Sequence, residues 1–447
     1  MNLWDRFLYR DRGIIPTKRL LFITFVYSAV LVFASVLEFS WTFVIVCNII
    51  ALLLTLFDLF YSANKKEISF KRKIAGEMER GIAYTVEIEI NNASRYALKF
   101  RFVDGIPQSF DRSFPIDGKV SGNKTERVMY ETTALVRGQY EIEKLYFRYT
   151  SVFGLWEKQI TAELPATIKV IPDLTETKQY LESAQRFLKY EGSKIRKSKS
   201  GVGEFAKIRT HVVGDDPRMI NWRQTAKLYE VMSNEYEPEH GKVITILIDC
   251  GRLMGAELTK GNRLEKVLES ALTVSAAALK KGDSVSVLAF SKDVKVFVPA
   301  SKGMGHLQTI LQAIYNVNVD SVESNYAHVL QYLQTVQKKR SLLLLFSDIR
   351  TFLYEESALY YLQRLRQRHL FFMIGIEDEM LLTKLKEEPQ SLQKAMVKSM
   401  AQQEMLFKKR EKMKWEKQGL LMVEAKEEKL AVTAVSHYFQ MINRGLL

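Results

Sequence analysis

The stretch Val243-Ile244-Thr245-Ile246-Leu247-Ile248 decides the fold of the second half of the chain, and it ends in Asp249. A short, continuous apolar run of this kind is typical of a strand buried on both faces of a parallel sheet. Further apolar runs cover residues 284–290, 342–346, 369–376 and 420–423, and helical patterns between them cover 263–281, 305–314, 327–338 and 354–368. Strands that alternate with helices predict an α/β doubly wound sheet domain over 241–447. It includes C-terminal helices, one of them over 390–417.

Two carboxylates follow strands of this predicted sheet. Asp249 comes after the first strand, and Ser347-Asp348 comes after the third. Ligands of open α/β sheets bind at the carboxyl ends of the strands, so both carboxylates lie where a ligand is expected. The alternative is structural, because such aspartates also cap strand ends or pair with arginines.

Upstream of the sheet domain, residues 67–173 show a period of two. Polar and apolar residues alternate over 84–90, 98–103 and 140–147, and turn signals such as Asp104-Gly105 and Asp117-Gly118 separate these segments. Short alternating strands without helical patterns predict a β-sandwich. This region contains no recognisable catalytic constellation.

The N-terminal segment, 1–66, carries two apolar runs. Leu20–Leu37 and Phe39–Phe57 contain no charged residue, and only Glu38 separates them. Each run is about as long as the 20 helical residues needed to cross a hydrocarbon core. We therefore expect a transmembrane hairpin with spans at about 20–37 and 39–60, rather than a cleaved signal peptide, because no clean cleavage site follows the first run.

Lysines and arginines bracket the predicted hairpin on both sides, whereas its turn carries only Glu38. The positive-inside rule then places both termini and the soluble domains in the cytoplasm, with the protein in the inner, or cytoplasmic, membrane. Asp58, near the end of the second span, is expected to be an interfacial charge beside the lysines.

The cysteine count and the net charge limit the kinds of site and partner that the chain can have. The 447 residues carry a net charge of +14 and only two cysteines, Cys47 and Cys250. This excludes a disulfide framework and a cysteine metal cluster. The basic excess fits a membrane surface, an acidic partner or nucleic acid. Much of this excess brackets the hairpin or lies in a predicted basic linker at 174–200. Of the three partners, nucleic acid is therefore the least needed to explain the positive charge.

The most distinctive segment is 201–240. Asp216 is suited to cap a helix whose first residue is Pro217, with Ile220, Trp222 and Ala226 following on that short helix. Arginines flank Asp215 and Asp216, so ion pairs are expected. Two adjacent aspartates also hold catalytic metals in some nucleases, and a metal-dependent hydrolase or nuclease using Asp215 and Asp216 is therefore an alternative.

One set of spaced residues in this segment resembles the hallmark of a widespread bacterial family: Arg209-x-His211-x-x-Gly214-Asp215-x-x-Arg218-x-Ile220-x-Trp222-x-x-x-Ala226. It is the domain-of-unknown-function family number fifty-eight, whose members accompany MoxR-type AAA+ ATPases. Arg137-Gly138-Gln139-Tyr140, Phe153-Gly154-Leu155 and Ser347-Asp348 agree with the family in the same order. His211 departs from it, since the family usually has tyrosine there. The resemblance implies two spans, a β domain and a von Willebrand factor A-like sheet domain.

The resemblance also raises the question of a metal. Related domains hold Mg²⁺ in an adhesion site built from Asp-x-Ser-x-Ser, a threonine and a later aspartate. Here Asp249 and Asp348 are kept, but Gly251 and Leu253 stand in place of the serines, and Arg252 brings a positive charge near the ion's position. We expect a degenerate metal site without a bound ion, and no other cofactor. A metal-ion-dependent adhesion domain is nevertheless kept as an alternative function.

The sequence lacks the GxxxxGK, HExxH and GxSxG patterns of common catalytic sites, so no enzyme activity is expected. The resemblance instead implies a membrane-anchored protein-binding module that serves a MoxR-type AAA+ ATPase as adaptor, substrate or scaffold in envelope or stress-related assembly. We expect partner binding at the edge of the sheet domain where the strands end and where Asp249 and Asp348 lie, called the strand-end edge below. We also expect it through the residues Arg209, Gly214, Asp215, Arg218 and Trp222.

Overall fold

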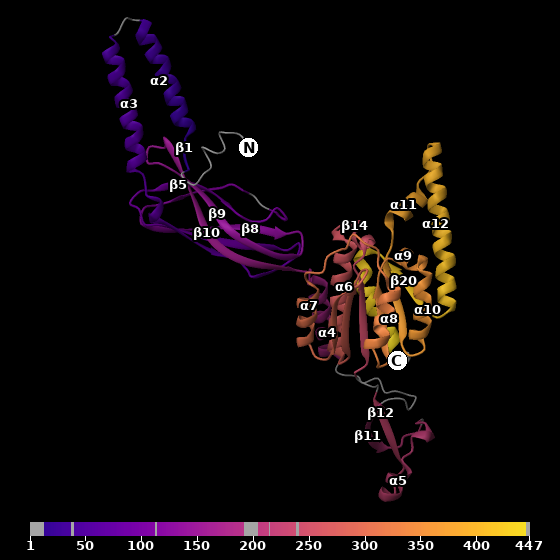
Figure 1. The fold of residues 1–447 in the computed structure, drawn as a ribbon. Coiled ribbons are helices and arrows are strands. Elements are labelled where there is room, and N and C mark those ends of the chain that lie inside the picture. The colour runs from indigo at the N-terminus through magenta and orange to yellow at the C-terminus, as the bar shows by residue number, and fades with distance from the viewer. Residues whose placement is uncertain are drawn as a thin grey trace. The chain divides into compact units, whose positions relative to one another are not determined.

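The computed structural model describes residues 13–36, 40–111, 114–191, 204–213, 215–237 and 241–443. The chain divides into two compact units, Met1–Ile171 and Pro172–Leu447. The first unit holds two long helices and two β-sheets, and the second holds a helix-covered sheet and a small hairpin module (Figure 1).

Two sheets in the first unit share one core. The larger has the strand order β1-β10-β9-β5-β7 with β3 beside β10, and the smaller has the order β2-β4-β8-β6. The larger sheet consists of β1 (Ile14–Pro16), β3 (Glu77–Glu79), β5 (Leu98–Asp104), β7 (Ile116–Val120), β9 (Gly138–Thr150) and β10 (Trp156–Ile171). The smaller consists of β2 (Ile68–Lys73), β4 (Ala83–Asn92), β6 (Phe110–Asp111) and β8 (Lys124–Ala134). Strand β1 comes from the segment that was predicted to precede the sandwich, and it pairs with β10 as a short edge strand of the larger sheet.

The period of two seen in the sequence produces this packing. In β5, Leu98, Phe100 and Phe102 are buried while Lys99 and Arg101 are exposed. Alternate residues of β4 on the facing sheet are buried against them. Alternate side chains of a strand point to opposite faces, so each strand contributes one apolar row to the core.

A buried ion pair joins the two sheets. Arg72 of β2 is bound to Asp104 of β5, and both side chains are almost completely inaccessible. The Tyr130 hydroxyl donates to Asp104 at 2.7 Å, and Arg72 also donates to the Ile142 carbonyl at 3.2 Å. A further bond reaches the carbonyl of Leu164, where the register of β10 shifts beside Pro165. Burial raises the pKa of the Tyr130 hydroxyl, and the Asp104 charge adds to this effect.

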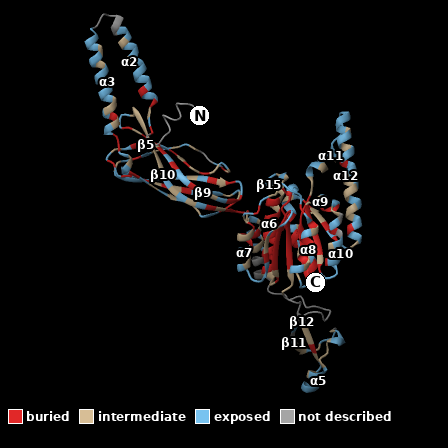
Figure 2. Cartoon of the chain, in the orientation of Figure 1, coloured by how far each residue is buried: buried red, intermediate tan, exposed pale blue. Residues whose placement is uncertain are grey.

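The helices α2 (Lys18–Val36) and α3 (Trp41–Tyr61) leave the same end of the sandwich (Figure 1). Most of their side chains are exposed although they are apolar (Figure 2). Within the described residues, one helical segment, Trp41–Glu67, is long and apolar enough to cross a membrane. The helix α2 covers most of the range predicted for the first span, and the turn at 37–39 lies outside the described residues.

Asp58, which the sequence predicts to be an interfacial charge, lies near the end of α3. Its side chain is completely buried against the turn between β9 and β10. The carboxylate accepts hydrogen bonds from Ser151 Oγ at 2.6 Å, Phe153 N at 3.0 Å and Leu155 N at 3.2 Å. The sequence does not reveal these contacts, because it does not show that the β9–β10 turn folds back onto the helix.

The same turn is bound to the start of α2. Thr17 Oγ1 donates to the Gly154 carbonyl at 2.7 Å, and Trp156 Nε1 donates to the Thr55 carbonyl of α3 at 2.9 Å. Gly154 has φ of +75°, a conformation that favours glycine. The element Phe153-Gly154-Leu155 therefore forms the joint between both helices and the sandwich.

The second unit contains a six-stranded sheet of order β17-β16-β13-β18-β19-β20. All neighbours pair in parallel except β17, which is antiparallel to β16. The strands are β13 (Val243–Asp249), β16 (Ser284–Phe290), β17 (Val294–Ser301), β18 (Ser341–Phe346), β19 (Leu370–Ile376) and β20 (Leu421–Ala425). All five predicted strands are present, and β17 is an edge strand that the sequence pattern did not identify.

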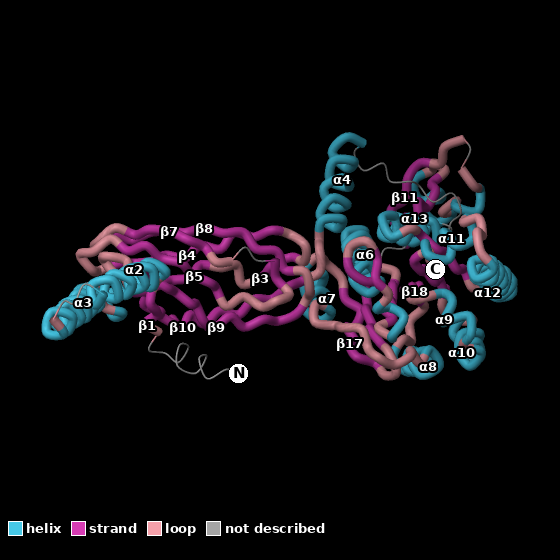
Figure 3. The backbone as a smooth tube through the Cα atoms, turned by 90° about the horizontal axis from the view of Figure 1, so that it is seen from above, coloured by secondary structure: helices cyan, strands magenta, loops and turns pink. Residues whose placement is uncertain are grey.

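Helices cover both faces of this sheet (Figure 3). One face carries α6 (Arg263–Lys281), which packs on β13 and β16, and α13 (Leu430–Asn443), which packs on α6 and β19. The other face packs against α8 (Tyr326–Val336), α9 (Ile349–Tyr354) and α10 (Glu356–Arg366) around Phe352 and Leu362. Beside α6 lies α7 (Gly305–Ile314), and α12 (Leu392–Lys417) packs on β20 and α9 after α11 (Glu379–Lys386). This is the predicted doubly wound arrangement.

Two predicted boundaries differ. The helix predicted over 354–368 corresponds to α10, and a further short helix, α9, precedes it because Asp348 caps α9 immediately after β18. The basic linker predicted over 174–200 begins as the helix α4 (Thr175–Glu191), which packs on α6. Lys266 of α6 pairs with Glu176 at 2.8 Å, and Thr177 bonds Thr273 at 2.9 Å. Residues 192–200 of the predicted linker lie outside the described residues.

The predicted signature segment forms a small module of its own. β11 (Glu204–Thr210) and β12 (Met232–Glu237) form an antiparallel hairpin, and the 3-10 turn η2 (Pro217–Met219) and α5 (Trp222–Leu228) lie in its loop. Residues 192–203 and 238–240, which join this module to the sheet domain, lie outside the described residues.

The Arg72–Asp104 pair yields a stability prediction. Replacing Arg72 by alanine leaves a buried carboxylate unpaired, which costs about 3–5 kcal/mol. We expect amide hydrogen exchange in β9 and β10 of the full-length chain in detergent to accelerate by roughly two to four powers of ten. Arg101→Ala is the control, because the Arg101–Asp117 pair is exposed and contributes at most about 1 kcal/mol. Equal exchange in the two variants would contradict a structural role for the buried pair.

Candidate functional site

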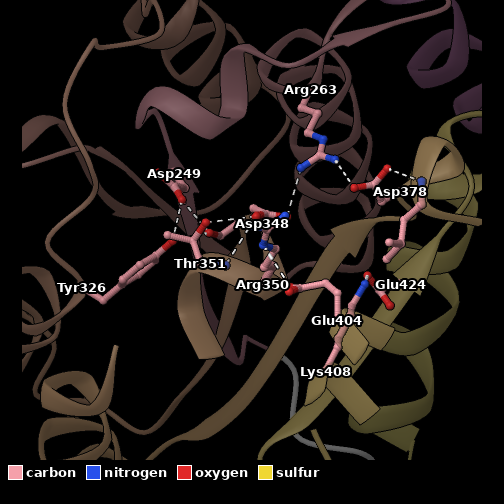
Figure 4. Close-up of polar contacts among 12 residues, drawn as sticks. Asp249, Arg263, Tyr326, Asp348, Arg350, Thr351, Asp378, Glu404, Lys408 and Glu424 are labelled. Carbon is pink, nitrogen blue, oxygen red and sulfur yellow. Dashed lines mark hydrogen bonds and ion pairs between the residues drawn. The ribbon is translucent and has the colours of Figure 1, made fainter. Parts of the chain in front are cut away.

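The carboxyl ends of β13, β18 and β19 place the predicted metal residues at one edge of the sheet (Figure 4). Asp249, the last residue of β13, is almost completely buried. Its carboxylate accepts hydrogen bonds from Ser347 Oγ at 2.5 Å, the Tyr326 hydroxyl at 2.8 Å and the Gly251 N–H at 2.8 Å, and from Ser324 Oγ. Burial raises the pKa of Asp249 above its ordinary value, although these hydrogen bonds act in the opposite direction.

Gly251 stands where an adhesion-type metal site would have a serine, and the Ser324 hydroxyl lies in the space that this serine would fill. A side chain at Gly251 would collide with Ser324 Oγ, which approaches from the loop before α8. The glycine therefore gives the Ser324 hydroxyl access to Asp249. A hydroxyl from another loop thus occupies the place that the missing serine leaves, and it bonds the carboxylate itself.

Asp348 has a different environment at the same edge. It caps the N-terminus of α9, accepting from Thr351 Oγ1 at 3.0 Å, and it pairs with Arg263 at 3.0 Å. Both side chains of this pair are largely buried. Arg263, at the start of α6, also lies 3.9 Å from Asp378 in the turn after β19. The positive charge at this edge therefore comes from Arg263, whereas Arg252, which the sequence suggested, is exposed and pairs with Glu323 at 2.9 Å.

A cavity of about 840 Å³ opens beside Asp348. Ten carboxylate side chains and four cationic ones line it, the cations being Arg252, Arg263, Arg350 and Lys408. Arg350 pairs with Glu404 of α12 at 3.0 Å, and Lys408 pairs with Glu424 at the end of β20 (Figure 4). The excess of carboxylates favours a cationic group and disfavours the carboxylate that an adhesion-type metal would attract.

The residues at this edge do not fit a magnesium site. Hard cations take several oxygen ligands, but the Asp249 oxygens already accept four hydrogen bonds and Asp348 faces a guanidinium. Within the described ranges, no group of three or more histidine, cysteine or carboxylate side chains is arranged to hold a metal ion. Asp249 and Asp348 therefore have separate structural partners rather than one shared ligand.

The predicted partner-binding residues lie in the hairpin module. Arg209 of β11 pairs with Asp215 at 2.7 Å, and Asp215 also accepts from the Val212 N–H at 2.9 Å. The hydrogen bond from Arg209 lowers the pKa of Asp215 to about 2, and the bond from Val212 adds to the effect. The ion pair fixes the loop that follows β11, and Gly214 within this loop lies outside the described residues.

The helix predicted to start at Asp216 is shorter than expected. Asp216 accepts from the Arg218 N–H at 2.9 Å and caps η2, but this turn ends at Met219. Ile220 then bridges to Ser233 of β12, and Asn221 caps α5 as a new helix. Asp215 is thus paired with an arginine, and Asp216 caps a turn. These separate roles disfavour the hydrolase alternative, in which both carboxylates would hold one metal ion.

Trp222, the first residue of α5, is 70% exposed. Arg218, Arg223 and Lys227 are exposed near it in sequence, and they form no ion pair with the described carboxylates. Further large apolar side chains of the module are exposed, namely Phe205, Val212, Val213, Leu228, Tyr229 and Val231. An aromatic anchor with free arginines is the composition found at the centre of protein interfaces.

The sequence reasoning missed Arg263, Asp378 and the α12 pairs of the strand-end edge. Asp378 could have been found, because it follows the fourth apolar run as Asp348 follows the third. Arg263, Glu404 and Lys408 could not, because their place depends on how α6 and α12 pack on the sheet.

Comparison with known proteins supports part of the predicted resemblance. Residues 207–385, from β11 into α11, match the family described as "Protein of unknown function DUF58". The "Uncharacterized protein YeaD" of Bacillus subtilis (strain 168) is 24% identical over 201 residues, which are 44% of this chain and 48% of that protein. The chain thus spans about half the length of this relative. The resemblance is confirmed for the matched range, and the association with a MoxR-type ATPase stays a prediction.

Solved structures with partial similarity also exist. The conserved hypothetical protein BatB from Bacteroides thetaiotaomicron aligns over 46% of this chain and 100% of its own, with 12% identity and a TM-score of 0.32. The PapD-like domain 7 of human CEP192 aligns over 24% of this chain and 85% of its own, with 13% identity and a TM-score of 0.18. The folds of the two units therefore rest on their own strand order and packing.

The environment of Asp249 yields a second prediction. Cys250 beside it is buried, so the alkylation rate of its thiol in a Cys47→Ala background reports opening of the sheet domain. Asp249→Ala leaves buried hydroxyls without an acceptor and should cost about 2–4 kcal/mol. Asp249→Asn resembles the protonated carboxyl and should cost clearly less.

The pH dependence follows from the raised pKa of Asp249. The folded state holds this proton more tightly than the unfolded state, so its contribution to stability is lost as the pH rises through the folded-state pKa. After correction for thiol ionisation, opening of the wild-type chain should increase with pH, and opening of Asp249→Asn should not. Millimolar Mg²⁺ should leave both unchanged. Protection of the wild-type thiol by Mg²⁺, absent in Asp249→Asn, would instead establish a metal site.

Proposed function

We propose that the chain is a membrane-anchored protein-binding module with a von Willebrand factor A-like sheet domain. Its proposed partner is a MoxR-type AAA+ ATPase, which it serves as adaptor, substrate or scaffold in envelope or stress-related assembly. The observation that carries the binding function is the exposed Trp222, with cations near it in sequence that form no ion pair with the described carboxylates, in the small hairpin module. The resemblance of the 209–226 spacing supports this choice of partner.

The proposed anchor is a pair of spans, α2 and α3, in the bacterial inner membrane. Apolar helices with exposed side chains are unfavourable in water and suited to lipid. Cations lie near the sandwich end of both helices, Lys18 and Arg19 at the start of α2 and Lys65 and Lys66 after α3. The positive-inside rule then favours cytoplasmic termini and cytoplasmic soluble units.

The proposed contact surface consists of Trp222 and Arg218, held by the Arg209–Asp215 pair. Arg209 and Asp215 are satisfied by each other, so they act by fixing the loop from which η2 and α5 start. Among the described residues, the Arg218 side chain has no hydrogen-bond partner that holds this loop, so its replacement should affect binding without opening the module. A partner pocket that accepts an indole ring and carries carboxylates at its rim is complementary to this surface.

The metal-ion-dependent adhesion function is the weaker alternative. It requires free oxygen ligands at Asp249 and Asp348, and these carboxylates are bound by hydroxyls and by Arg263. The hydrolase alternative needs Asp215 and Asp216 to share a metal, whereas each has its own hydrogen-bond donors.

The binding proposal is tested with the full-length chain in nanodiscs and a purified MoxR-type ATPase from the same organism. Truncation of an interface anchor costs about 2 kcal/mol or more, so Trp222→Ala should weaken binding by roughly 30-fold or more, and Arg218→Ala should weaken it too. Tyr360→Ala is the matched control, because Tyr360 is a similarly exposed aromatic side chain on α10. Undiminished retention of the ATPase by an Asp215→Asn/Arg218→Ala variant would overturn the proposed surface.

A further inference from the structure

The turn between β9 and β10, Ser151–Leu155, carries an exposed apolar tip. Phe153 is 60% exposed and the neighbouring Val152 is also exposed, although the ends of the same turn are buried or half-buried. Large apolar side chains at the tip of a turn are unfavourable in water, and a contiguous exposed apolar surface marks a contact with a partner or a membrane.

The hydrogen bonds of the turn fix this tip beside the ends of both helices. The Phe153 N–H donates to Asp58, three residues before the end of α3, and the Gly154 carbonyl accepts from Thr17, which directly precedes α2. The Phe153 backbone is therefore at the level of the last turn of α3. This contact lies within the first unit, and it does not depend on the position of any other part of the chain.

The last turn of α3 presents more side chains of the same kind. Phe60 and Tyr61 are exposed there, and Tyr61 stacks on Phe57 with ring centroids 5.0 Å apart. Arg95, in the loop between β4 and β5, lies over the Tyr61 ring at 5.7 Å. Aromatic side chains concentrate at the boundary between hydrocarbon and headgroups, where their rings are partly desolvated.

Cations surround this aromatic surface. Lys18, Arg19 and Arg95 are exposed and form no ion pair with the described carboxylates, since Asp58 is satisfied by the turn. Basic side chains near an anionic lipid surface are attracted to its phosphate groups. Apolar tip, aromatic ring and cations thus meet at one end of the sandwich, which is the composition of a lipid-facing surface.

We propose that this end of the β-sandwich is seated on the membrane, with Phe153 and Val152 inserted at the lipid interface and Lys18, Arg19 and Arg95 at the headgroup phosphates. The occupant of this surface is the bilayer that α3 enters. The inference rests on the proposed membrane insertion of α3. It adds that the sandwich is a membrane-contacting domain rather than a domain suspended below its anchor.

Spin labels on the full-length chain in nanodiscs of phosphatidylcholine and phosphatidylglycerol test this contact. Labels are placed at Phe153→Cys, Val136→Cys and Leu53→Cys in a Cys47→Ala/Cys250→Ala background. Val136 is the matched control, because it is an exposed apolar residue in the turn at the opposite end of β9, about 40 Å away along the strand. The label at Leu53 reports whether α3 is in the bilayer.

We expect the labels at 53 and 153 to be accessible to oxygen and shielded from a polar nickel complex, and the label at 136 to show the reverse. Nickel access at 153 equal to that at 136, with position 53 still shielded, overturns the membrane contact and leaves the anchor intact. Nickel access at position 53 as well overturns the proposed anchor itself. In nanodiscs of phosphatidylcholine alone, the label at 153 should become several-fold more accessible to nickel, because the cations lose their anionic partners. Unchanged accessibility in those nanodiscs would contradict the role assigned to the three cations.

Discussion

One buried carboxylate, Asp58, joins α3 to the sandwich of the first unit. A charged group inside a protein is costly unless hydrogen bonds replace its water shell. Asp58 receives three such bonds from the β9–β10 turn, and it stands on a helix that is otherwise exposed and apolar. The helix can satisfy this carboxylate only while the turn is docked. The orientation of α3 on the sandwich is therefore fixed by this requirement together with the Thr17 and Trp156 bonds.

The two carboxylates at the strand-end edge of the sheet domain are also satisfied by groups of the protein, but here this leaves no oxygen free for a metal. Asp249 is satisfied by three hydroxyls and a backbone N–H, and Asp348 by Arg263 and the start of α9. The protein's own groups thereby occupy the oxygens that a metal would need. What remains open at this edge is a cavity with an excess of carboxylates, which suits a basic group of a protein partner better than an acidic one.

Periodicity predicted most of the secondary structure, because burial on one or both faces leaves a direct record in the sequence. The apolar run 243–248 and the alternating residue types at 98–103 correspond to β13 and β5. Contacts between distant segments leave no such record. The lysines near Asp58 indicate an interfacial charge but not its burial by a turn 93 residues later, and Arg263 becomes part of the strand-end edge only through the packing of α6.

Two glycines have structural roles that the sequence around them does not show. Gly154 permits the turn that both helices bind, and Gly251 admits the Ser324 hydroxyl to Asp249. In the sequence, the first belongs to the element Phe153-Gly154-Leu155, and the second stands where an adhesion-type metal site would have a serine. In both cases the physical reason is space or backbone conformation, which spacing alone does not reveal.

The rigid joint at Asp58 is tested most directly by the distance distribution between a spin label in the middle of α3, at Leu53→Cys, and one on the sandwich, at Met129→Cys in β8. The measurement uses the full-length chain in nanodiscs and in a background without native cysteines. A narrow distribution is predicted for the chain with Asp58 and a broad one for Asp58→Ala, while replacement of the exposed carboxylate Asp117 should leave it narrow. A broad distribution with Asp58 present, or the same narrow one in Asp58→Ala, would contradict the central role of this carboxylate.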